Sequence, residues 1–64
     1  MTIKQVKRGT MITLKDIEYP NAAQVWIRGE YIRETKKYEL TNYDDVSRFR
    51  YVKGEKECFT DFIF

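Results

Sequence analysis

The stretch QVWIRGEYIRETKKYEL, residues 24–40, decides the fold, because it contains a glycine inside a strand-like run. The chain can reverse at Gly29–Glu30, as a two-residue hairpin loop, or at residues 34–37. Reversal at 34–37 is favoured, since it separates two apolar-alternating arms of comparable length. Gly29 then marks a bulge where one long strand, 24–33, bends. A helix across 30–40 is the third alternative, but its apolar residues make a poor stripe at helical spacing.

The rest of the chain alternates in the same way. Residues 10–15 predict a strand, and EYPNAA at 18–23 predicts a turn. YDDVS at 43–47 predicts a turn or a single 3₁₀ turn, and residues 48–64 predict a hairpin that reverses at 53–56. Five strands without a convincing helix indicate a single all-β domain, residues 1–64. A five-stranded antiparallel barrel or strongly curved sheet, SH3-like, would bury the apolar face and hide the strand edges.

The amino-acid composition argues against catalytic, metal-binding and phosphate-binding sites. The chain has 64 residues, no histidine and one cysteine, Cys58. Cys58 has no histidine partner and is expected in or near the core. The acidic residues lack metal-ligand spacing, and the three glycines form no phosphate-binding loop. We therefore expect no enzyme, no metal, no cofactor and no small-molecule substrate.

The sequence also bears on location. No long apolar run follows the first charged residues, and none reaches the roughly 18–20 residues that cross a bilayer. One cysteine cannot form an internal disulfide, which is typical of proteins of a reducing compartment. We expect a cytoplasmic protein with no membrane partner.

Trp26 and Arg28 form the first candidate binding pair. They share one face of the 24–33 strand, so if Val25 and Ile27 point into the barrel, Trp26 points out with Arg28 beside it. Trp and Arg dominate interface energetics, and the same pair could stack a nucleobase and hold a phosphate. The alternative is that Trp26 closes the open end of the barrel or packs on Met11.

Arg48, Arg50 and Lys53 form the second candidate group. Arg48 and Arg50 share a face opposite Phe49 and Tyr51, and Lys53 extends the basic row at the turn. The alternative reading is a solubilising face, neutralised by glutamates on neighbouring strands.

The chain resembles small uncharacterised β-rich proteins of bacteriophages and related bacterial mobile elements. The resemblance covers residues 24–64 and is carried by residues 26–29, Lys37–Tyr38, residues 44–46, Lys53–Gly54 and residues 59–62. It implies a phage or prophage setting and, for a bacterial host, its cytoplasm. It implies no activity, ligand or site residue.

Two functions follow from these patterns. The first is a small protein-interaction or self-associating module, because the predicted last strand is apolar on both faces and the net charge is only +2, from 12 basic and 10 acidic residues. The second is a nucleic-acid-binding barrel, because Lys4, Lys7 and Arg8 lie near the N-terminus and the candidate arginines are interleaved with aromatics.

Overall fold

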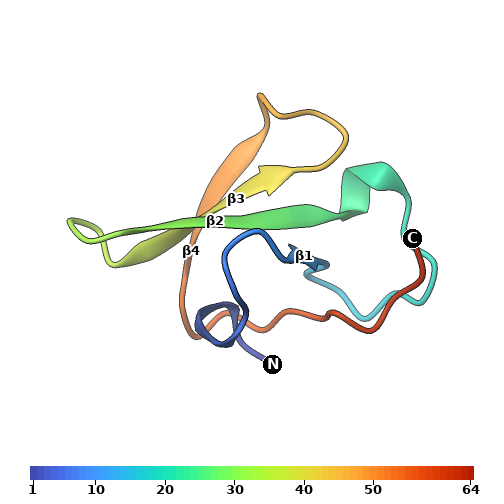
Figure 1. Ribbon diagram of the computed structural model, residues 1–64, viewed down its shortest axis with the longest axis horizontal. Coiled ribbons are helices and arrows are strands. Elements are labelled where there is room, and N and C mark those ends of the chain that lie inside the picture. The colour runs from blue at the N-terminus through green and yellow to red at the C-terminus, as the bar shows by residue number, and fades with distance from the viewer.

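The computed structural model describes residues 1–64 as an open antiparallel sheet of four strands in the order β1-β2-β3-β4 (Figure 1). The strands are β1 (Met11–Ile12), β2 (Trp26–Ile32), β3 (Lys37–Asn42) and β4 (Phe49–Lys53). Two 3₁₀ turns, η1 (Ile3–Gln5) and η2 (Ala22–Gln24), are the only helical elements. Neither has the length or the apolar character that crossing a membrane requires. The predicted all-β, antiparallel class is confirmed.

β2 is the bent strand that its sequence predicts. The register between β2 and β3 shifts between Arg28 and Tyr31, which places Gly29 in a bulge. A Cβ atom at Gly29 would lie 3.1 Å from the carbonyl oxygen of Glu39, so a side chain at this position would force β3 to shift by a few tenths of an ångström. The chain reverses at residues 33–36, where Lys36 adopts a left-handed φ of 58°. The hairpin loop at Gly29–Glu30 and the helix across 30–40 are both absent.

The predicted fifth strand and the closed SH3-like barrel are not confirmed. Residues 58–64 form no strand, and the C-terminal segment makes only two isolated bridges, Thr2 with Glu57 and Thr13 with Phe59. These bridges reach two different segments, so successive residues do not build a ladder along one neighbour. The sheet therefore keeps β4 as an open edge.

The core lies on one face of the sheet, which we call the inner face. The N-terminal and C-terminal segments cover this face and contribute Ile3, Val6 and Cys58 to the core. Backbone hydrogen bonds fix them, including Ile3 N–H to the Lys56 carbonyl at 3.0 Å and Cys58 N–H to the Met1 carbonyl at 2.8 Å. The sheet itself contributes Ile12, Trp26, Leu40 and Val52. On the opposite, outer face of the sheet, Met11, Phe49 and Tyr51 are exposed.

Candidate binding surface on strand β4

β4 presents different chemistry on its two faces. Arg50 lies opposite Leu40 and Val52 opposite Tyr38, so these two residues belong to the inner face. Phe49, Tyr51 and Lys53 alternate with them and belong to the outer face. Phe49 is 55% exposed and Tyr51 is 47% exposed.

The aromatic pair on the outer face is continuous with other apolar side chains. The Phe49 and Tyr51 rings lie 5.8 Å apart in an edge-to-face arrangement at 75°. Phe49 continues a row across the sheet through Thr41 and Ile27 to Met11, which is also exposed. Exposed aromatic side chains that share one face with apolar neighbours are typical of interaction surfaces.

A shallow hollow adjoins this aromatic pair. It has a volume of about 230 Å³ and is lined by Ile32, Thr35, Lys37 and Tyr51. Its place beside the β2–β3 turn gives the outer face a concave end.

Of the two alternatives for Trp26, the structure contradicts the outward side chain and supports a packed one. Trp26 is only 9% exposed and belongs to the core, because it pairs with Ile12 on one side and Asn42 on the other, both fully buried. Val25 is buried as well, but it follows the 3₁₀ turn η2 and precedes β2. Strand alternation therefore does not extend through Val25, and the two neighbours are both buried.

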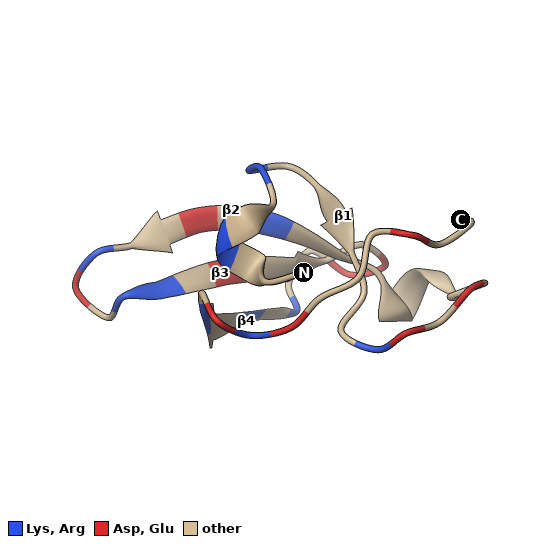
Figure 2. Ribbon diagram, turned by 90° about the horizontal axis from the view of Figure 1, so that it is seen from below, with Lys and Arg blue, Asp and Glu red and all other residues tan.

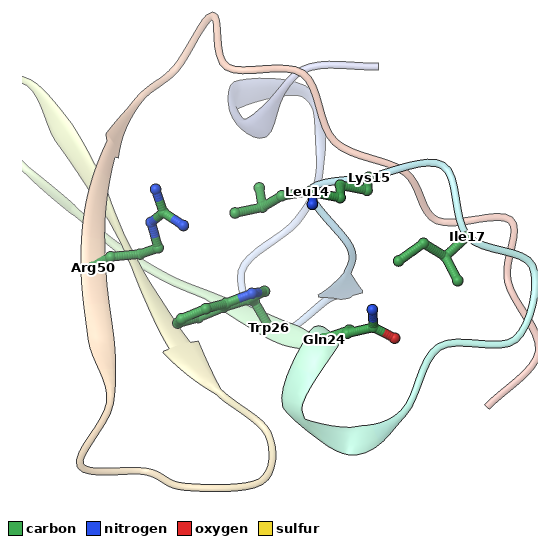
Figure 3. A pocket seen from close by; sticks show the side chains of 6 residues that line it. All are labelled: Leu14, Lys15, Ile17, Gln24, Trp26 and Arg50. Carbon is green, nitrogen blue, oxygen red and sulfur yellow. The ribbon is translucent and has the colours of Figure 1, made fainter.

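Arg48 and Arg50 lie over the ring of Trp26. Their guanidinium carbons are 5.9 and 5.7 Å from the ring centroid, within the range of cation–π attraction. A pocket of about 180 Å³ opens beside them, as Figure 3 shows. Its lining residues are Leu14, Lys15, Ile17, Gln24, Trp26 and Arg50. The structure thus joins Trp26 to Arg48 and Arg50, which the sequence placed in separate groups.

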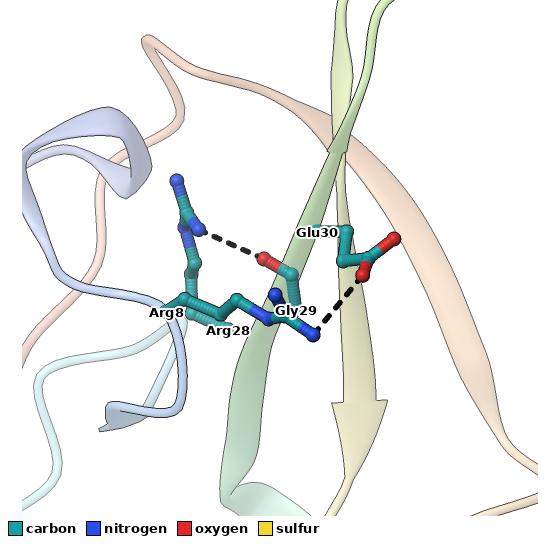
Figure 4. Close-up of polar contacts among 4 residues, drawn as sticks. All are labelled: Arg8, Arg28, Gly29 and Glu30. Carbon is teal, nitrogen blue, oxygen red and sulfur yellow. Dashed lines mark hydrogen bonds and ion pairs between the residues drawn. The ribbon is translucent and has the colours of Figure 1, made fainter.

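Arg28 does not join this cluster, although it shares the inner face. Its guanidinium carbon lies 4.4 Å from the centroid of the Tyr38 ring, and its Nη1 donates to the Gly29 carbonyl at 2.9 Å (Figure 4). Its buried Nε has no hydrogen-bond partner. These contacts tie Arg28 to the bulge of β2 and make it a structural residue of the bend.

Arg50 and Lys53 of β4, and Arg48 just before it, form no ion pair, although Arg48 is close enough to help lower the pKa of the Asp45 carboxyl. The only ion pair of the chain joins Arg8 to Glu30 at 3.0 Å (Figure 4), so Arg48, Arg50 and Lys53 remain unpaired. Lys53 lies on the outer face opposite Lys37, so the predicted single basic row is divided between two faces. Across the whole chain, acidic and basic residues are interspersed (Figure 2).

A buried amide positions β4 relative to the sheet. Asn42 is fully buried, and its Nδ2 donates to the Ala23 carbonyl at 2.9 Å. Its Oδ1 accepts from the backbone N–H groups of Asp44 at 3.1 Å and Asp45 at 3.2 Å. This side chain therefore fixes the loop that leads into β4. An Asn at a turn before two aspartates is the sequence signal for such a role.

Asp45 closes the same loop. Its Oδ1 accepts from the Ser47 hydroxyl at 2.6 Å and from the Ser47 N–H at 3.0 Å. These two hydrogen bonds hold the pKa of the Asp45 carboxyl below its usual value. Arg48, directly after them, is thereby presented at the start of β4.

Cys58 is fully buried, and burial raises the pKa of its thiol. A thiol with a raised pKa is a poor nucleophile at neutral pH. No group of three or more His, Cys, Asp or Glu side chains could hold a metal ion.

The aromatic pair of β4 is the feature that sequence reasoning missed. Its signal is RFRYVK, residues 48–53, in which aromatics and cations alternate on an edge strand. Alternation alone does not say which face is buried. The burial of Leu40 and Val52 identifies the face of β4 that points into the core.

Comparisons with protein-family models, with curated proteins and with solved structures find no match to this chain.

Proposed function

We propose that this protein is a non-enzymatic protein-interaction module that binds its partner through the outer face of β4. The observation that carries the proposal is the pair Phe49 and Tyr51, two adjacent aromatic side chains about half exposed on one face. Aromatic residues contribute large contact area at low conformational cost, and they are enriched in the residues that dominate interface energetics. The residues at the turn between β2 and β3 line the adjoining hollow, which can take a side chain of the partner.

The setting that goes with this proposal is the bacterial cytoplasm, with the chain encoded by a phage or prophage. The resemblance of residues 24–64 to small phage proteins supports that setting. In this proposal the protein acts in an SH3-like way, as a small curved sheet that binds its partner through an exposed face.

The test is affinity capture with matched variants. Wild-type protein is compared with the double variant Phe49→Ser/Tyr51→Ser and with Tyr19→Ser, which removes an aromatic side chain that is 68% exposed outside the sheet. The proposal expects one captured protein that is lost with the double variant and kept with Tyr19→Ser. Identical capture by all three would contradict it. Sedimentation equilibrium of the same variants shows whether the partner is a second copy.

Nucleic-acid binding is the second candidate, and the unpaired cations favour it. Lys37 and Lys53 share the outer face with the two exposed rings, Arg48 and Arg50 lie on the inner face, and none of the four forms an ion pair. Exposed rings flanked by cations can stack bases and hold phosphates. Titration with oligothymidylate tests this: the logarithm of the affinity should fall with the logarithm of salt concentration by about 0.7 per neutralised phosphate. No binding at low salt would remove this candidate.

A further inference from the structure

The open edge of β4 exposes backbone groups that no other segment uses. Asn42 N–H donates to the Arg48 carbonyl at 2.9 Å, which sets the phase of hydrogen bonding between β3 and β4. In an antiparallel pair, every second residue points its N–H and C=O at the neighbouring strand. With Thr41 opposite Phe49 and Glu39 opposite Tyr51, the backbone groups of Phe49 and Tyr51 therefore point away from β3.

A strand added at this edge would meet two different surfaces. Its side chains would alternate, one set beside Phe49 and Tyr51 on the outer face and the other beside Arg48 and Arg50 on the inner face. The first set contacts aromatic rings, and the second contacts exposed guanidinium groups, neither of which forms an ion pair. The matching strand alternates apolar and acidic residues.

Charge selects against a second copy of the chain at this edge. Residues 48–53 carry Arg48, Arg50 and Lys53 and no acidic residue. Two β4 strands paired with each other would bring these cations together without a compensating carboxylate, and like charges on opposed strands destabilise a sheet. Charged residues on an edge strand are a common protection against self-pairing. A strand that carries carboxylates meets no such barrier.

We propose that β4 accepts an extended acidic segment of another protein as an antiparallel fifth strand, with acidic residues beside Arg48 and Arg50 and apolar residues beside Phe49 and Tyr51. This inference rests on the proposed protein-binding function and names the class of partner. It belongs to the general mode in which main-chain hydrogen bonds supply affinity and alternate side chains supply specificity.

The test uses a short fluorescein-labelled peptide in which glutamate and valine alternate, and fluorescence anisotropy reports its binding to the full chain. In antiparallel pairing, the valines lie opposite Phe49 and Tyr51 and exchange backbone hydrogen bonds with them, while the glutamate N–H groups point away. N-methylation of the valines should abolish binding, and N-methylation of the glutamates should leave it within about twofold. Equal binding of both methylated peptides would overturn strand addition and indicate simple charge attraction.

Variants of the protein test the same edge from its own side. Tyr51→Pro and Tyr51→Ala remove the same ring, but only proline also removes the outward N–H, and proline is tolerated at such a position of an edge strand. Tyr51→Pro should abolish peptide binding, while Tyr51→Ala should only weaken it. Equal affinity of the two variants, both folded by circular dichroism, would overturn the inference.

Charge reversal and a competitor complete the design. Arg48→Glu/Arg50→Glu should weaken the peptide complex about tenfold or more, since two cross-strand pairs become repulsive. Tighter binding of oligothymidylate than of the peptide would overturn the inference in favour of nucleic acid. If the peptide fails to bind but Phe49→Ser/Tyr51→Ser still loses a captured protein, the proposed function stands and this inference alone fails.

Discussion

The substitution Asn42→Ala tests how the loop before β4 is held. It removes three hydrogen bonds of a fully buried side chain: one to the Ala23 carbonyl and two from the N–H groups of Asp44 and Asp45. Each such bond contributes roughly 0.5–1.5 kcal/mol net. Because Asp44 and Asp45 are exposed residues, water can satisfy part of what is lost. We therefore expect the free energy of unfolding to fall by about 2–3 kcal/mol, which is less than three full hydrogen bonds would contribute at the upper value.

Urea unfolding followed by the fluorescence of Trp26, the only tryptophan, measures this loss. The control is Thr41→Val, which removes a hydroxyl from the adjacent residue; that hydroxyl forms no hydrogen bond. This control should change the free energy of unfolding by no more than about 0.5 kcal/mol. A loss for Asn42→Ala no larger than that for Thr41→Val would refute the role assigned to the buried amide.

Three further predictions concern other parts of the chain. Gly29→Ala should lower the free energy of unfolding by about 1–3 kcal/mol, because its Cβ would lie 3.1 Å from the Glu39 carbonyl oxygen; an unchanged urea midpoint would contradict the bulge. Ser47→Ala should raise the pKa of the Asp45 carboxyl toward its usual value in an NMR titration, since both the hydroxyl bond and its support of the loop are lost, and an unchanged titration would argue against the Ser47 contact. Burial raises the pKa of the Cys58 thiol in the folded state, so its stabilising effect is complete below the unfolded pKa of about 8.5 and is lost as pH rises toward the folded value. The free energy of unfolding should therefore fall more steeply above that pH in the wild type than in Cys58→Ala, and parallel slopes would show that the thiol is not buried.

The bend of β2 could be predicted from sequence because local and long-range signals agree there. A glycine inside an alternating run and a polar stretch at 34–37 both point to one long bent strand. The structure confirms the bulge beside Gly29, and it places the reversal at 33–36, one residue before the predicted 34–37. A hairpin can be predicted from a single sequence when the local residue types and the strand lengths agree in this way.

The two 3₁₀ turns have a sequence signal of their own. In both, a glutamine three residues after the cap accepts from the cap N–H: Gln5 from Thr2 at 2.8 Å and Gln24 from Asn21 at 3.0 Å. TIKQ and NAAQ match the spacing of a capping box. Because NAAQ forms a 3₁₀ turn, strand alternation begins only at Trp26, and the direction of the Trp26 side chain does not follow from that of Val25.

The fifth strand could not be judged from sequence. An alternating apolar pattern shows that side chains are buried, but it does not say which segment pairs with the backbone. Residues 57 and 59 bridge to Thr2 and Thr13, which lie in different segments. The two faces of β4 could not be assigned from sequence for the same reason, since they depend on which residues of β3 it opposes.

Amide hydrogen exchange along β4 tests most directly that this strand is an open edge. Arg50 and Val52 point their N–H groups toward β3, whereas Phe49 and Tyr51 point theirs toward solvent. We expect slow exchange at Arg50 and Val52 and fast exchange at Phe49 and Tyr51 in the free protein. Equal protection at all four positions would mean that another strand already covers this edge, and it would contradict both the open sheet and the binding surface built on it.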